Sequence, residues 1–268
     1  MDFNEFKLYN VFVLIFITLQ TFNFMNYFFM VIPHNPNYIH HTQGKISSAL
    51  LREIVFGLED GMVSTLGAVT GIATATGSQF STLLSGLVVV SVESISMAVG
   101  SYLSNKSEKD TDNRKLFEEK EELHQYPEDE KEELYDMYVE SGWPKEMAKN
   151  MSDIASKNHD LFLKEMAYRE LEIIPDVVDY PIKKATVMFF SYLIGGAVPL
   201  TPYILLPINE AIPVSIVFTL LGLFLLGIFT TRFTKRKWWK AGLEMTALAS
   251  LAALIGYFVG QLVDGLMK

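Results

Sequence analysis

Long apolar runs separated by short polar stretches dominate both ends of the chain. Three of them are Glu53–Gly77, Thr82–Ser104 and Ala185–Leu206, and two more are Pro213–Thr231 and Ala241–Gly265. None follows the 3.6-residue alternation of a soluble helix, in which one face is polar. A helix of about 20 apolar residues is long enough to cross the hydrocarbon core of a bilayer. The pattern predicts an all-α fold, a polytopic membrane helix bundle with five core spans.

Another uncharged run, Leu8–Pro33, precedes these five. It is too long for a signal-peptide core, it has no basic leading segment, and no small-residue cleavage site follows it. We therefore expect residues 1–45 to form a hydrophobic extension with an extra membrane helix or a membrane-surface helix. Gln20 and Asn23 within the run weaken the spanning interpretation.

One polar segment interrupts the apolar pattern. Residues 105–184 carry 22 of the 31 acidic residues and 13 of the 22 basic ones, which accounts for the whole net charge of −9. This composition is typical of solvated helices. It predicts a helical domain inserted between the first two core spans, in residues 46–104, and the last three, in residues 185–268.

Positive charges lie in alternate loops. Lys45 and Arg52 precede the first core span, basic residues flank both ends of the insert, and the loop Arg232–Lys240 has five positive charges. Short loops rich in lysine and arginine stay on the cytosolic side of a membrane. The acidic insert is therefore expected in the cytosol, in a multi-pass protein of a vacuolar or other internal membrane or of the plasma membrane.

Several classes of function are disfavoured by what the sequence lacks. The chain has no cysteine, which excludes disulfides, thiolate metal sites and cysteine nucleophiles. Its acidic net charge gives no basis for binding nucleic acid. It has no phosphate-binding loop or nucleophile elbow, so we expect neither an ATP-driven pump nor an enzyme, and no permanently bound cofactor.

Carboxylates inside the apolar spans point to a transport pathway, because a charge in the bilayer is costly and usually functional. Asp60 and Met97 each lie eight residues from the cytosolic end of their span, which places both roughly 12 Å deep. Glu93 lies one turn deeper than Met97, and Glu53 lies at the entrance. A carboxylate with a thioether suits a divalent transition metal. For the glycines on the same face, helix packing is the simpler interpretation.

The insert contains closely spaced glutamates. Glu119-x-x-Glu122 and Glu130-x-x-Glu133 lie on either side of Pro127, which breaks the helix and allows the two pairs to face each other. Four converging carboxylates repel one another unless a cation is bound. A third predicted helix brings Met166 and Glu170 onto one face. The alternative is a solvated acidic helix hairpin that Lys120 and Lys131 neutralise.

Sequence blocks in this order resemble the vacuolar iron transporter family over about residues 47–265. The blocks are Leu51–Gly61 (LREIVFGLEDG), Glu93–Ser104 (ESISMAVGSYLS), Lys106–Glu108, the paired glutamates around Pro127, and Gly195–Tyr203 (GGAVPLTPY). The resemblance implies five membrane helices per chain and a homodimer with the pathway at its interface. It also implies that Fe²⁺ leaves the cytosol in exchange for protons.

The resemblance also assigns roles to residues. Asp60 and Met97 match the metal-binding pair of the pore, and Glu53 matches an acidic position near its cytosolic entrance. The positions that match the cytosolic metal site are Glu119, Glu122, Glu130, Glu133, Met166 and Glu170.

The chain departs from the family pattern at two positions. Some members carry a glutamate where this chain has Val89, and Glu93 is the candidate to replace it. A second methionine of the third insert helix is Ala167 here. Three alternatives remain: transport of another divalent ion such as Mn²⁺, Co²⁺ or Zn²⁺, a membrane-anchored metal sensor or storage module, and a di-iron enzyme. The last needs more histidine ligands than the insert offers.

Overall fold

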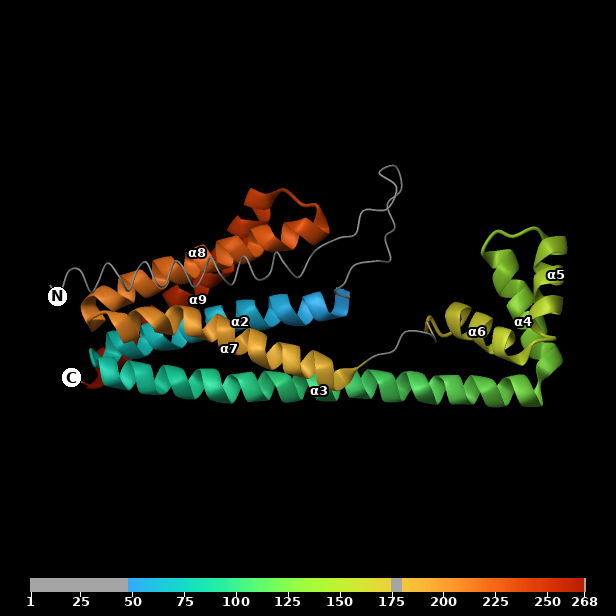
Figure 1. Ribbon diagram of the computed structural model, residues 1–268, viewed down its shortest axis with the longest axis horizontal. Coiled ribbons are helices and arrows are strands. Elements are labelled where there is room, and N and C mark those ends of the chain that lie inside the picture. The colour runs from blue at the N-terminus through green and yellow to red at the C-terminus, as the bar shows by residue number, and fades with distance from the viewer. Residues whose placement is uncertain (1–47, 175–179, 268) are drawn as a thin grey trace. The chain divides into compact units, whose positions relative to one another are not determined.

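The computed structural model describes residues 48–174 and 180–267, and all regular structure within these ranges is α-helical (Figure 1). The predicted all-α class is confirmed. The predicted N-terminal helix at Leu8–Pro33 lies outside the described residues. The helices are α2 (Ser48–Thr76), α3 (Gln79–Gln125), α4 (Pro127–Glu140), α5 (Lys145–Ala155), α6 (His159–Arg169), α7 (Pro181–Leu205), α8 (Ile208–Thr234) and α9 (Trp238–Met267).

The described chain forms two compact units. The first combines the residues up to Val99 with those from Lys184 onward, and the second consists of Gly100–Lys183. The boundary falls within α3, a helix of 47 residues whose first half is apolar and whose second half is charged. This one helix therefore contributes to both units.

Three of the described helices are long and apolar enough to cross a membrane, namely α3, α7 and α8. The other two predicted core spans lie on α2 and α9, with 29 and 30 residues. Both exceed the length of about 20 residues that a bilayer requires. Helix α2 is less apolar because it carries the acidic residues Glu53, Glu59 and Asp60. The first unit is thus a membrane helix bundle.

Small residues bring the helices of the first unit into close contact. A Cβ atom added to Gly61 of α2 would lie 2.5 Å from the carbonyl oxygen of Tyr192 and 2.9 Å from the nitrogen of Gly196, both on α7. Gly260 of α9 is equally close to the backbone of Gly71 on α2. Figure 1 shows α2 running beside α7 within this bundle. The glycines therefore serve the helix packing that the sequence suggested.

The outer surface of this unit is apolar, unlike that of a soluble protein. Its interior buries small hydroxyl side chains such as Thr65, Thr70 and Thr219, whereas Leu87 and Val92 of α3 are more than half exposed. The Thr219 hydroxyl donates to the Ser215 carbonyl oxygen at 2.8 Å, as a buried hydroxyl does in a medium without water. This arrangement is typical of a bundle whose outer surface contacts lipid.

The second unit has a hydrophobic core of its own. Leu123 at the end of α3, Leu134 and Tyr138 of α4, and Phe162 and Met166 of α6 are buried together. Pro127 is the first residue of α4, only two residues after α3 ends, so the chain changes direction sharply between them. Burial of this core fixes the relative positions of α3, α4 and α6, which carry the acidic residues described next.

Candidate functional site

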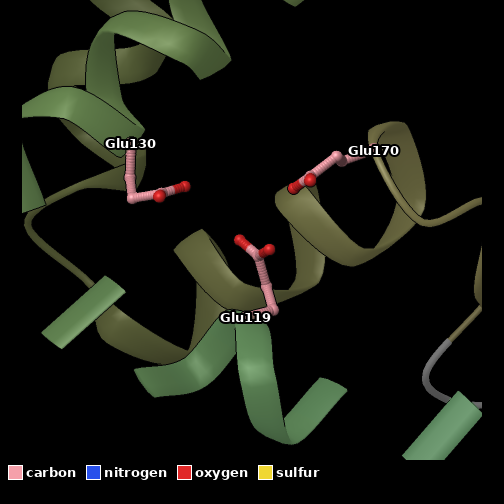
Figure 2. Close-up of side chains that lie close together, drawn as sticks. All are labelled: Glu119, Glu130 and Glu170. Carbon is pink, nitrogen blue, oxygen red and sulfur yellow. The ribbon is translucent and has the colours of Figure 1, made fainter. Parts of the chain in front are cut away.

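Three glutamates from three helices meet in the second unit (Figure 2). Glu119 lies on α3, Glu130 on α4, and Glu170 follows the last residue of α6. One carboxylate oxygen from each lies within 4.8 Å of those from the other two. Glu119 and Glu130 are buried and Glu170 is exposed. The group therefore has an open side through which an ion can enter.

Burial and mutual repulsion raise the pKa values of the two buried carboxylates of this cluster. Burial, followed by a hydrogen bond and repulsion from Glu170, raises the pKa of Glu119 to about 8. Burial and the neighbouring carboxylates, led by Glu133, raise the pKa of Glu130 to about 7. Glu119 Oε1 and Glu130 Oε2 are buried without a hydrogen-bond partner among the described residues. Carboxylate oxygens in this arrangement are suitable ligands for a divalent cation, which relieves their repulsion.

The remaining predicted ligands surround this trio. Glu122 and Glu133 are exposed, and both act electrostatically on Glu130. The pKa of Glu133 is raised by burial and by Glu170 and Glu122. Met166 is fully buried in the hydrophobic core, one helical turn before Glu170. The structure thus gathers the five glutamates in one region and places the methionine in the core beneath them.

Lys131, which the sequence offered as a neutralising partner for the glutamates, makes a different contact. Its Nζ lies 2.6 Å from Asp153 Oδ1 on α5. The proximity of Asp153 raises the pKa of Lys131, and Lys131 lowers the pKa of Asp153. This ion pair connects α4 to α5. It weakens the alternative in which Lys131 compensates the glutamate pairs.

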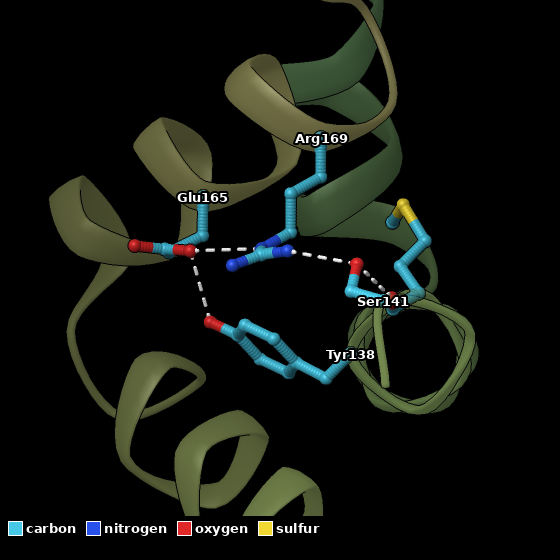
Figure 3. Close-up of polar contacts among 5 residues, drawn as sticks. Tyr138, Ser141, Glu165 and Arg169 are labelled. Atoms are coloured by element: carbon cyan, nitrogen blue, oxygen red, sulfur yellow. Dashed lines mark hydrogen bonds and ion pairs between the residues drawn. The ribbon is translucent and has the colours of Figure 1, made fainter. Parts of the chain in front are cut away.

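A second polar group holds α6 against α4 beside the cluster (Figure 3). The Tyr138 hydroxyl donates a hydrogen bond to Glu165 Oε2 at 2.9 Å, and Arg169 Nε donates to the same oxygen at 3.1 Å. Arg169 also donates to the Ser141 hydroxyl at 3.3 Å. Arg169 immediately precedes Glu170. The sequence analysis did not identify these residues, because a tyrosine and an i, i+4 charge pair are ordinary features of a helical surface.

The predicted pathway residues lie in the first unit. Glu53 is buried, and its Oε1 lies 3.4 Å from the Arg52 guanidinium. Asp60 is partly buried and lies within electrostatic range of Glu93 on α3. Glu93 is exposed on the surface of the single chain, and Met97, one turn later, is partly buried. These two interacting carboxylates come from consecutive spans, α2 and α3.

A buried tyrosine adjoins these carboxylates. The Tyr192 hydroxyl on α7 lies 2.6 Å from Ser64 Oγ, and Ser64 Oγ donates to the carbonyl oxygen of Asp60 at 2.7 Å. Tyr192 is completely buried and is within electrostatic range of Asp60 and Glu93. The sequence analysis did not identify Tyr192. The small residues Gly195 and Gly196, one turn later on α7, were a signal that α7 approaches α2 at this point.

Comparison with known proteins places this geometry in context. The model of the VIT family matches residues 51–261. The chain is 28% identical over 227 residues to vacuolar iron transporter 1 of Arabidopsis thaliana, which covers 84% of this chain and 91% of that protein. It is 28% identical over 229 residues to vacuolar iron transporter 2 of rice, Oryza sativa subsp. japonica, covering 85% and 91%. The vacuolar iron transporter of Plasmodium falciparum is 27% identical over 220 residues, covering 78% and 81%.

Proposed function

The chain belongs to the VIT family, and from this premise we propose that it is a membrane transporter that moves Fe²⁺ out of the cytosol in exchange for protons. The relatives' names support iron as the transported ion and the vacuole or another internal membrane as its location. The family match over residues 51–261, with Asp60 and Glu93 within electrostatic range of each other in a membrane bundle, carries the proposal. Two carboxylates at this depth need a cation or protons to balance their charge.

We assign the acidic insert, residues 105–184, to the cytosol, where it collects the ion. Glu119, Glu130 and Glu170 supply oxygen ligands, with Glu122, Glu133 and Met166 close by. Oxygen ligands suit Fe²⁺ and Mn²⁺ alike, whereas the thioether of Met97 in the pore favours the softer transition metals over Ca²⁺ and Mg²⁺. Glu53, at the cytosolic end of α2, receives the ion before it reaches Asp60.

Protons release the ion. A carboxylate binds a metal only when it is deprotonated, so metal and proton compete at Asp60 and Glu93. Protons that enter from the lumen neutralise these groups, and the ion then leaves toward the lumen. Glu93 performs the role of the carboxylate that is absent at Val89. Tyr192 and Ser64 extend a hydrogen-bonded connection from the Asp60 backbone into the bundle.

We infer that the active form is a homodimer. Glu93 is exposed on α3 among the apolar residues Val92, Ile95 and Val99, each at least half exposed in the single chain. An ionisable side chain directed at lipid is costly, whereas the same side chain in a pathway between two copies is hydrated. Cross-linking of cysteines introduced at Val92 in an otherwise cysteine-free chain tests this arrangement directly.

Flux into proteoliposomes tests the transport proposal. We expect Fe²⁺ uptake by vesicles containing the full chain to require a pH gradient that is acidic inside, and Asp60→Ala to abolish it. Glu59→Gln, one residue away on the same helix, is the matched control and retains uptake. Mn²⁺ competition measures ion selectivity. Normal uptake by Asp60→Ala refutes the pore assignment, and tight metal binding without any flux favours a sensor or storage module instead.

A further inference from the structure

The end of α8 and the start of α9 present a concentrated positive charge. Residues 232–240, here called the basic loop, contain five basic residues and no acidic one. All nine residues are exposed. Arg236 forms an ion pair with Glu244, whose Oε2 lies 2.6 Å from the Arg236 guanidinium. Along the sequence, residues 232–244 carry five basic residues and one acidic residue, which is a strong local excess of positive charge.

Close helix packing gives the basic loop a defined shape. A Cβ atom added to Gly227 of α8 would lie 2.6 Å from the carbonyl oxygen of Ala241 on α9. The Phe224 and Trp238 rings meet edge to face with their centres 6.3 Å apart. Lys235 adopts the left-handed conformation that ends α8, with φ of 52°, and its N–H donates to the Thr231 carbonyl. The chain therefore turns within three residues between two fixed helices.

Two tryptophans accompany the charges. Trp238 is 57% exposed and Trp239 is 44% exposed, and Lys240 Nζ lies 5.5 Å from the centre of the Trp239 ring. Tryptophan next to an apolar span prefers the level of the lipid headgroups, where its ring contacts chains and its N–H contacts polar groups. Binding of a soluble anion would explain the positive charges but not the two large exposed apolar rings. A lipid surface explains both the charges and the rings.

The α2–α3 and α7–α8 turns, at the other end of α8, lack these features. Gln79, at the start of α3, donates hydrogen bonds to the Tyr203 and Leu206 carbonyls at the end of α7, so the α2–α3 and α7–α8 turns lie together. Neither turn has a basic residue, and Glu210 is the nearest charge to the second. Helix α8 separates them from the basic loop by its 27 residues. Among these described turns of the bundle, the positive charge and the tryptophans lie only in the one between α8 and α9.

We propose that the basic loop is a binding site for the headgroups of anionic phospholipids in the leaflet that it faces. The lysines and arginines contact the phosphate and carboxylate groups, and Trp238 and Trp239 lie among the adjoining glycerol and upper acyl segments. This inference does not depend on the identity of the transported ion. Because the basic loop joins α8 to α9, binding of headgroups there would make the packing of these two helices depend on the lipid composition of the membrane.

The distribution of tryptophan allows a direct test. The chain has three tryptophans, and Trp143 is the one outside the basic loop. In full-length Trp143→Phe protein, fluorescence therefore reports on Trp238 and Trp239. The protein is reconstituted in phosphatidylcholine vesicles that contain a minor fraction of phosphatidylserine. Bromine, which quenches tryptophan on contact, is placed on the acyl chains of either the phosphatidylserine or an equal fraction of the phosphatidylcholine.

We expect brominated phosphatidylserine to quench more strongly than brominated phosphatidylcholine at the same mole fraction. We expect this difference to disappear in the triple variant Lys235→Gln, Arg236→Gln and Lys237→Gln. Each removed charge is expected to lower the preference for the anionic lipid on the order of fivefold. The matched control neutralises three exposed lysines of the insert, Lys145, Lys149 and Lys157, and is expected to preserve the difference.

Salt provides an independent readout with the unsubstituted loop, because high salt screens an electrostatic preference without any change in sequence. We expect the difference in quenching to become smaller as the salt concentration rises. Equal quenching by the two brominated lipids at low salt would overturn the proposal, since it indicates ordinary contact with bulk lipid. Loss of the difference on addition of soluble glycerophosphoserine would also overturn it, because it shows that the headgroup binds without the membrane.

Discussion

The guanidinium carbon of Arg169 lies 4.2 Å from the centre of the Tyr138 ring, and both side chains bond to the same oxygen of Glu165. The three groups connect the end of α6 to the last turn of α4. Burial and the contact with Glu165 raise the pKa of Tyr138 to about 12, so its hydroxyl remains a donor at physiological pH. Because Glu170 follows Arg169, the same contacts hold its carboxylate opposite Glu130.

Arg169→Ala is therefore expected to weaken metal binding by the insert. It removes the cation–π contact and the partly exposed charged hydrogen bonds, at a cost of about 1–2 kcal/mol in the free energy of unfolding. We expect about a tenfold loss of affinity for Mn²⁺ in calorimetric titration of the full chain. Tyr138→Phe keeps the ring and loses one hydrogen bond, so its effect is smaller. Arg114→Ala, which breaks an exposed pair with Glu118, is the control. Equal affinity in Arg169→Ala and the control contradicts a positioning role.

Metal binding is expected to release protons from the cluster. With pKa values of about 8 for Glu119 and about 7 for Glu130, the two carry roughly one to one and a half protons together at pH 7, and close to none at about pH 9.5. Apparent affinity therefore rises with pH up to the pKa of Glu119 and then levels off. Calorimetry in buffers of different ionisation enthalpy counts the released protons. Binding without proton release at pH 7 would show that the ion does not use these carboxylates.

Much of this architecture was accessible from the sequence. The apolar runs predicted the membrane helices, because length and hydropathy are sufficient for that inference. The spacing of Glu119 and Glu130 around Pro127 pointed to their convergence, since a proline two residues after one helix begins the next. What the sequence did not reveal depends on contacts between distant segments. The partner of Lys131 is Asp153, and nothing in the local pattern distinguishes that carboxylate from the many others nearby.

The role of Tyr192 was inaccessible for a similar reason. In the sequence it is one aromatic residue in an apolar run, and only the contact between α2 and α7 brings its hydroxyl to Ser64. The open side of the acidic cluster also follows from tertiary structure. Glu119 is buried because α4 and α6 cover this part of α3, although its neighbours Glu118 and Lys120 are exposed.

Without metal, the protein is expected to lose stability as the pH rises. The folded-state pKa of Glu119 is about 8, well above its ordinary value of 4.5, so the folded state binds more protons than the unfolded state between these values. The free energy of unfolding then falls across this window and is lowest above about pH 8. Glu119→Gln removes the buried charge, and we expect a higher melting temperature at pH 8.5 and a flatter pH profile.

The same variant is expected to bind metal at least tenfold more weakly, because an amide is a poorer ligand and carries no charge. Glu121→Gln, two residues away and exposed, is the matched control for both measurements. Scanning calorimetry of the detergent-solubilised chain, with and without Mn²⁺, separates the two effects. If Glu119→Gln were less stable than the parent at high pH, the carboxylate would instead be a stabilising structural group.

The contact between α2 and α7 is expected to tolerate no side chain at Gly61. A Cβ atom there meets the backbone of Tyr192 and Gly196, which cannot move as the end of a flexible side chain can. Gly61→Ala therefore forces the two helices apart, and we expect a cost of about 1–3 kcal/mol in stability, as for other overpacked interiors. The same displacement separates Tyr192 from Ser64, so transport falls together with stability.

In Gly100→Ala, the added Cβ has open space around it in the single chain, and alanine favours a helix by up to about 1 kcal/mol. Thermal unfolding of both variants, followed by circular dichroism, compares a crowded glycine with an open one. A Gly61→Ala variant as stable as Gly100→Ala would mean that α2 and α7 lie farther apart in the membrane than this close packing requires.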